Sequence, residues 1–157
     1  MHPYPHHYLA AAAGGPTGLI AVDSAGLERI QTAPPPEFDG PGGVWSPETL
    51  LCASLADCFI LTFRAVSRKA QYKWSHLLCR VEGVLERVDG QSQFTQFKTI
   101  VRLIVPSGTD PAQAQKLLEQ AEHGCLIANS LRATRTLEVQ VTASQAAETP
   151  AALTGER

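Results

Sequence analysis

The feature that most constrains the fold is a long apolar segment, SPETLLCASLADCFILTF, at residues 46–63. Ser46 offers an N-cap hydroxyl, Pro47 suits the first helical position, and Glu48 places a negative charge near the helix start. Beyond this start, polar residues are too few to confine the apolar surface to one stripe. The pattern predicts a central, mostly buried helix that ends around residues 68–71.

Such a helix needs more cover than one small sheet and two short helices can give, and a second copy of the chain would supply it. We therefore expect a homodimer. The chain has 157 residues, of which 44% are hydrophobic, which suits one domain with its own core. We expect no apolar run long enough to span a membrane.

The other elements are predicted from alternating apolar residues, turn residues and helix signals. We expect a single α+β domain over residues 1–143, with a flexible start at 1–7 and a disordered tail at 144–157. The predicted elements are strands at 18–22 and 27–32 with a further strand at 8–12, an irregular loop at 33–43, strands at 76–88 and 94–105, helices at 110–122 and 125–131, and a strand at 137–142. In the long hairpin, the positions expected to face the core are Leu77, Cys79, Val81, Leu85, Phe97, Val101, Leu103 and Val105.

The net charge is −2, from 13 basic and 15 acidic residues, and no basic block is present. Nucleic acid is therefore not expected as a partner. The N-terminus lacks the basic and apolar regions of a secretory signal, so we expect a cytoplasmic protein. His2, His6 and His7 could bind a metal, but an exposed histidine-rich terminus is the simpler interpretation, and no metal site is assigned.

Four cysteines lack the CxxC spacing and the density of a disulfide scaffold, so they should be free thiols at rest. Cys58, in the middle of the apolar helix, is by itself most simply a small core residue. Cys125 follows Gly124 at a predicted helix start, where unpaired amides favour a thiolate. Cys52 is about 120° from Cys58 around the helix, and Cys52 and Cys79 are both interpreted as core residues.

The segment GGVWSPETLLCASLADCF and the later HGCLIANSL, around Cys125, together resemble the OsmC/Ohr family of thiol-dependent hydroperoxide reductases. The resemblance covers roughly residues 8–143. It implies an OsmC-like fold with antiparallel sheets around a long buried helix, in an intertwined homodimer. It also implies that Cys58 is the peroxidatic thiol, that Cys125 resolves its sulfenic acid as a disulfide, and that Glu48 belongs to the site.

The resemblance further implies an organic hydroperoxide substrate, an external dithiol reductant of the lipoamide type, and no bound metal or flavin cofactor. An apolar helix would suit this chemistry, because an apolar pocket accepts the hydrocarbon part of a hydroperoxide and keeps a sulfenic acid away from bulk water. His123, next to the second motif, is interpreted as a surface residue and is left out of the site.

One feature of the family pattern is missing. Members of the family carry an arginine that activates the peroxidatic thiolate, at one of two positions in the N-terminal region. In this sequence the first position falls on Pro16 and the second on residues 36–38, none of which is an arginine. Arg29 and Arg64 match neither position, so the role is not assigned to them. Glu48 would then serve either in catalysis or only as a first-turn carboxylate beside the helix dipole.

The missing arginine keeps two other functions open. The chain could be an OsmC-like domain with little peroxidase turnover, which binds a hydrophobic small molecule or senses oxidants through its thiols. It could also be a structural dimer with inert thiols, although the position of Cys125 at a helix start argues against this.

Overall fold

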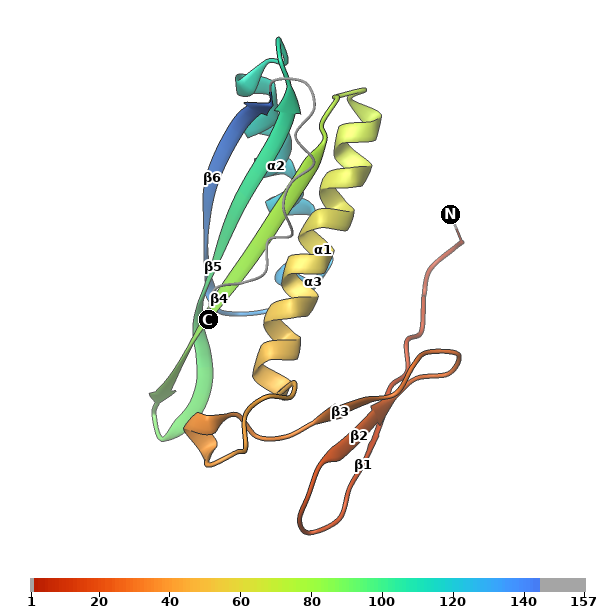
Figure 1. The fold of residues 1–157 in the computed structure, drawn as a ribbon, viewed down its shortest axis with the longest axis vertical. Coiled ribbons are helices and arrows are strands. Elements are labelled where there is room, and N and C mark those ends of the chain that lie inside the picture. The colour runs from red at the N-terminus through yellow and green to blue at the C-terminus, as the bar shows by residue number, and fades with distance from the viewer. Residues whose placement is uncertain (1, 145–157) are drawn as a thin grey trace. The chain divides into compact units, whose positions relative to one another are not determined.

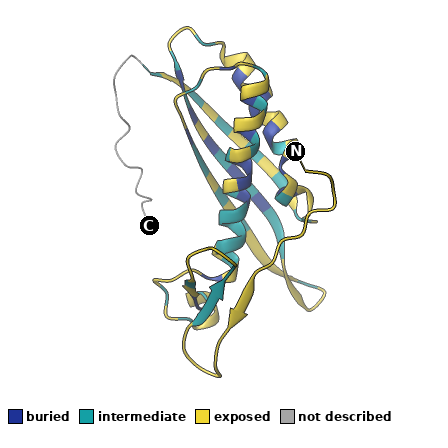
Figure 2. Ribbon diagram, turned by 90° about the vertical axis from the view of Figure 1, so that its right-hand side faces the viewer, coloured by how far each residue is buried: buried dark blue, intermediate teal, exposed yellow. Residues whose placement is uncertain are grey.

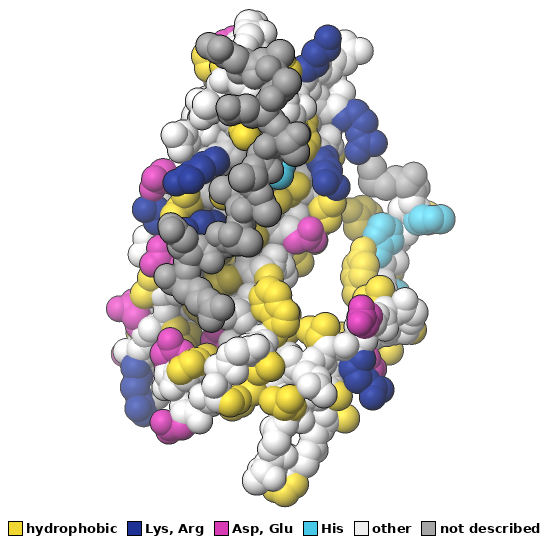
Figure 3. All heavy atoms as spheres, viewed as in Figure 1, with side chains coloured by type: hydrophobic (Ala, Val, Ile, Leu, Met, Phe, Trp, Pro, Cys, Tyr) yellow, Lys and Arg dark blue, Asp and Glu magenta, His cyan; other side chains and the backbone are white. Residues whose placement is uncertain are grey.

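Residues 2–144 are described by a computed structural model, in which the chain divides into two units, Met1–Leu51 and Cys52–Arg157. Their elements are drawn in Figure 1. Of the tail predicted over 144–157, only Ser144 belongs to the described residues. Charged side chains of both signs are interspersed over the face seen in Figure 3, which agrees with the small net charge of −2.

The first unit contains a small antiparallel sheet in the order β1-β2-β3. Its strands are β1 (Ala11–Ala13), β2 (Ile20–Asp23) and β3 (Ile30–Thr32), which confirms the predicted hairpin and its additional strand. The loop predicted to lack regular structure includes one turn of 3-10 helix, η1 (Pro36–Phe38).

The long helix α1 (Pro47–Lys69) begins and ends where the sequence predicts. Ser46 and Thr49 cap its start reciprocally. The Thr49 amide donates to Ser46 Oγ at 3.2 Å, and the Ser46 amide donates to Thr49 Oγ1 at 2.9 Å. Two of the amides that a helix start leaves unpaired are thereby satisfied.

The second unit contains a three-stranded sheet with β5 in the centre. Strand β4 (His76–Val88) pairs with β5 (Gln91–Pro106) in the predicted hairpin. Strand β6 (Thr134–Ser144) runs parallel to β5, so the expectation of purely antiparallel sheets is wrong for this pair. The physical reason is that β6 returns after α2 (Pro111–Gly124) and α3 (Leu126–Asn129), a crossover long enough to join parallel strands.

The core lies between α1, α2 and one face of the β4-β5-β6 sheet. Its largest fully buried side chains include Phe59 and Phe63 of α1, Leu103 of β5 and Leu118 of α2. The predicted alternation holds along β5. It fails at Leu85 of β4, which is exposed, because a bulge between Val84 and Leu85 shifts the register.

Helix α1 is less buried in the single chain than its sequence suggests. Only Leu55, Cys58, Phe59, Phe63 and Ser67 are buried, along one side, and exposed residues occupy the other side (Figure 2). By length and composition α1 could cross a membrane, so the expectation that no segment is long and apolar enough is wrong. In this fold its buried stripe packs on the sheet, as in the core helix of a soluble protein.

Candidate functional site

The structure brings together two of the predicted site residues, Cys58 and Cys125. Both are buried free thiols, and their side chains share a hydrogen bond. Cys58 lies in the middle of α1, whereas Cys125 occupies the single residue between α2 and α3. Two thiols in contact inside an apolar core can exchange a proton or form a disulfide when one of them is oxidised.

Local contacts hold the two thiol-bearing segments together. Thr62, one turn after Cys58, donates its hydroxyl to the Cys58 carbonyl at 2.8 Å. The methyl group of the same side chain faces Gly124, the residue that precedes Cys125. On the other side of Cys125, the amide of Asn129 donates to the Cys125 carbonyl at 2.9 Å. The backbone around Cys125 is therefore fixed from both sides.

Cys125 is kept protonated by its surroundings. The pKa of its thiol is raised to about 11, chiefly by burial, with smaller contributions from the hydrogen bond to Cys58 and from the charges of Cys58 and Glu122. An interaction with the backbone amide of Ala128 lowers this pKa. The Cys125 side chain nevertheless makes no capping hydrogen bond at the start of α3. The expectation that the helix start favours a Cys125 thiolate is wrong, because α3 has only four residues and burial outweighs it.

The two remaining cysteines have raised pKa values as well. Burial raises the pKa of Cys52, against a smaller opposing contact from the Gly83 backbone. The pKa of Cys79 is raised to about 12, chiefly by burial, with smaller contributions from the nearby charges of Cys125 and Glu122. Cys79 packs against the core, as predicted. Its electrostatic interaction with Cys125 was not anticipated.

An ion pair borders the Cys125 segment. Arg135 of β6 and Glu122 of α2 approach to 3.5 Å between Nε and Oε1, with only 27% and 15% of their side chains exposed. Arg135 also donates from Nη1 to Asn129 Oδ1 at 3.2 Å. Glu122 and Arg135 were not predicted as site residues. The available signals were a carboxylate three positions before Cys125 and an arginine on an inward position of an alternating strand.

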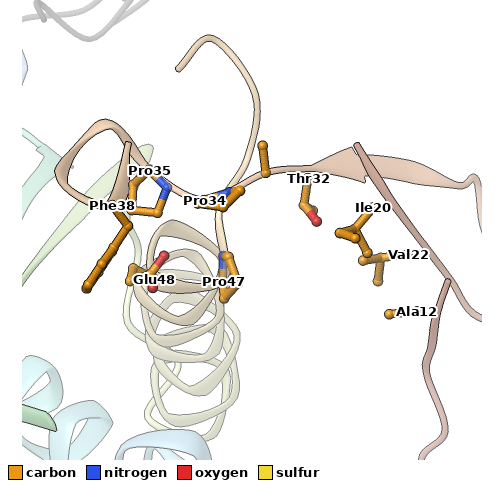
Figure 4. A pocket seen from close by; sticks show the side chains of 10 residues that line it. Ala12, Ile20, Val22, Thr32, Pro34, Pro35, Phe38, Pro47 and Glu48 are labelled. Atoms are coloured by element: carbon orange, nitrogen blue, oxygen red, sulfur yellow. The ribbon is translucent and has the colours of Figure 1, made fainter. Parts of the chain in front are cut away.

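Glu48, the third predicted site residue, belongs to the first unit. Its Oε2 atom is buried and has no hydrogen-bond partner among the described residues. It borders an apolar cavity of about 430 Å³ within that unit (Figure 4). The lining residues are Ala12, Ile20, Val22, Thr32, Ala33, Pro34, Pro35, Phe38, Pro47 and Glu48. A carboxylate oxygen in such surroundings is an acceptor that a ligand or a partner residue could satisfy.

Neither arginine considered as a replacement pairs with Glu48. Arg29 forms an ion pair with Asp23 at 3.0 Å between Nη2 and Oδ2 on the surface, and Arg64 is exposed on α1. Within residues 2–144, no group of three or more His, Cys, Asp or Glu side chains could hold a metal ion.

Comparison with known proteins gives a consistent result. The family model described as OsmC-like protein matches residues 40–145. The uncharacterized protein YmaD of Bacillus subtilis (strain 168) is 30% identical over 144 residues, covering 88% of this chain and 93% of YmaD. Peroxiredoxin OsmC of Escherichia coli (strain K12) is 24% identical over 124 residues, covering 79% and 85% of the two chains.

The fold is likewise similar to a solved structure from Legionella pneumophila. That structure is an organic hydroperoxide resistance protein OsmC, with a TM-score of 0.69 and 24% identity. The match covers 89% of this chain and 99% of the other.

Proposed function

Because this chain belongs to the OsmC-like protein family, we propose that it is a thiol peroxidase that reduces organic hydroperoxides to alcohols with two cysteines. The family includes a peroxiredoxin and organic hydroperoxide resistance proteins, which supports a redox role in general. The observation that carries the specific proposal is the hydrogen bond between the buried thiols of Cys58 and Cys125.

In the proposed cycle, the Cys58 thiolate attacks the distal oxygen of the hydroperoxide. The O–O bond breaks, the alkoxide leaves and is protonated to the alcohol, and Cys58 becomes a sulfenic acid. The Cys125 sulfur then attacks the Cys58 sulfur, and the departing hydroxide takes the Cys125 proton and leaves as water. An external dithiol of the lipoamide type reduces the resulting disulfide to two thiols and becomes a disulfide itself.

Burial supports this assignment of roles. A sulfenic acid at Cys58 would form in the core, where bulk water and further oxidant have little access, and its nearest thiol is a hydrogen-bonding partner. Glu48 is proposed as a third site residue, because its unpartnered oxygen would accept a hydrogen bond from a donor that orients the substrate or a cation. No bound cofactor or metal is part of the cycle.

We also propose a cytoplasmic homodimer. Leu61 lies on the exposed side of α1 with 50% of its surface accessible, and a second copy of the chain would cover this large apolar side chain. A cytoplasmic location would keep the four cysteines reduced at rest.

The test is peptide mapping by mass spectrometry of pre-reduced protein exposed to one equivalent of cumene hydroperoxide. We expect a disulfide between Cys58 and Cys125 to form rapidly in the native protein and to be absent in Cys58→Ser. The control is Cys52→Ser, which changes another cysteine of the same helix and should form the disulfide as the native protein does. If both thiols stayed reduced in folded protein, the peroxidase proposal would be wrong.

A second candidate function is binding of a hydrophobic small molecule with little turnover. The cavity of about 430 Å³ in the first unit, with the unpartnered Glu48 oxygen at its border, favours this candidate. Two results together would support the binding function. The protein would form no peroxide-induced disulfide, and octylamine, but not octanoate, would raise its melting temperature. The Glu48→Gln variant should then lose the response.

A further inference from the structure

The ion pair between Glu122 and Arg135 differs from the ion pair between Lys98 and Glu138, which also lies in the second unit. Its side chains are mostly buried, whereas Lys98 and Glu138 form a contact with side chains 42% and 62% exposed. A partly buried pair is screened less by solvent than an exposed one. The Glu122 carboxylate can therefore act on groups close to it, and it interacts with both Cys125 and Cys79.

The same arginine connects three elements around Cys125. Arg135 stands opposite Phe97 of the central strand β5, so its backbone is held by the sheet. Its guanidinium contacts Glu122 at the end of α2 and Asn129 at the end of α3. Asn129 in turn donates from Nδ2 to the His123 carbonyl at 2.9 Å and from its amide to the Cys125 carbonyl.

We propose that Glu122 and Arg135 are positioning residues for Cys125: Arg135 holds the Glu122 carboxylate and Asn129 beside the Cys125 segment, so that the Cys125 thiol faces Cys58 until Cys58 is oxidised. The consequence for turnover rests on the proposed thiol cycle. The arrangement itself rests only on the ion pair, the three Asn129 hydrogen bonds and the contact between the thiols.

A protonated Cys125 suits the resolving step. When Cys58 is a sulfenic acid, its hydroxyl must leave as water, and this requires a proton at the departing oxygen. The Cys125 S–H group is already hydrogen bonded to Cys58 and supplies that proton as its sulfur attacks. Until then, a neutral and buried thiol is a poor nucleophile toward peroxides and other oxidants.

The groups that face Cys125 come from three elements. They are Cys58 of α1, Cys79 of β4 and Glu122 of α2. Glu122 is the carboxylate among them, and Arg135 of β6 is its cationic partner. Removing either residue of the ion pair should therefore weaken the effect of the Glu122 carboxylate on Cys125 and increase the thiolate fraction of Cys125.

The test is a ¹³C NMR titration of reduced, cysteine-labelled protein, in which the Cβ shift of Cys125 is followed from pH 7 to 11.5 and assigned with Cys125→Ser. The Glu122→Gln variant should give about two- to fourfold more Cys125 thiolate at each pH below the midpoint, because a negative charge is lost. Arg135→Gln should also give more thiolate than the native protein, because the Glu122 carboxylate is no longer held beside Cys125, and Arg135→Lys should restore the native titration.

Glu119→Gln is the matched control, because it removes the same charge from an exposed position of α2, where Glu119 accepts a hydrogen bond from Gln115. It should leave the titration unchanged. An unchanged Cys125 midpoint in folded Glu122→Gln, or equal shifts in both glutamate variants, would overturn the proposal. This titration needs no peroxide, so its failure is distinct from the absence of a peroxide-induced disulfide, which would overturn the proposed function instead.

Discussion

The methyl group of Thr62 lies so close to Gly124 that a side chain at position 124 would crowd it. A Cβ atom built on Gly124 would lie 3.1 Å from Thr62 Cγ2, tighter than ordinary van der Waals contact. Thr62 follows Cys58 by one turn of α1, and Gly124 directly precedes Cys125. The missing side chain at Gly124 therefore permits the close approach of the segments that bear the two thiols.

This contact predicts that Gly124→Ala slows disulfide formation. The added methyl group should move the Cys125 segment by a few tenths of an ångström, and the rate of disulfide formation should fall about three- to tenfold, since reaction rates depend steeply on alignment. The measurement is stopped-flow oxidation with cumene hydroperoxide, with separate trapping of the Cys58 sulfenic acid by dimedone, which should be unaffected.

The control for this prediction is a second substitution that restores the space. Thr62→Ser removes Cγ2 but keeps the hydroxyl that donates to the Cys58 carbonyl. The double variant should recover most of the native rate. Equal rates in Gly124→Ala and in the native protein would show that the contact does not set the approach of the thiols.

A second prediction concerns the ionisation of Cys125. The thiol of Cys58 raises the pKa of Cys125, through their hydrogen bond and through its charge. Cys58→Ala should therefore lower the pKa of Cys125 and increase its thiolate fraction at every pH below about 11. We expect a larger shift than in Glu122→Gln, because Cys58 contributes two effects. The Cβ titration measures it, and Cys52→Ala should leave it unchanged.

A third prediction concerns the core beneath α1. Phe63 is fully buried and meets Trp74 edge-on, with ring centroids 5.3 Å apart. Phe63→Ala should lower the free energy of unfolding by about 3–5 kcal/mol, through lost burial and the cavity left behind. Urea denaturation measures the loss. A loss below about 1 kcal/mol would contradict the packing described here.

Leu61 on the exposed side of the same helix provides the contrast. Leu61→Ala should change the free energy of unfolding of a monomer by no more than about 0.5 kcal/mol. If the proposed homodimer covers this surface, the same substitution should instead weaken dimerisation, measured by sedimentation equilibrium. A monomeric native protein would contradict the homodimer proposal.

A fourth prediction concerns the start of α1. Ser46→Ala removes the acceptor for the Thr49 amide and should cost about 0.5–2 kcal/mol of stability. Ser46→Asp should retain most of the stability, because a carboxylate also accepts from the first-turn amides and suits the helix dipole. Thermal denaturation of the two variants measures this difference, and equal melting temperatures would count against a capping role for Ser46.

The sequence by itself determined the elements whose causes are local. The cap at Ser46 and the period-two pattern of β5 depend on neighbouring residues, and the structure places both elements within a few positions of their predictions. The two cysteine motifs were likewise recognisable from their order and context, and Cys58 and Cys125 do meet in the structure.

The tertiary structure alone decided the features that depend on distant residues. The bulge before Leu85, the parallel pairing of β6 and the ion pair of Glu122 with Arg135 each join segments that the sequence keeps apart. The protonation of Cys125 belongs with them. A helix start favours a thiolate locally, but desolvation depends on everything packed around the sulfur, and here it is the larger effect.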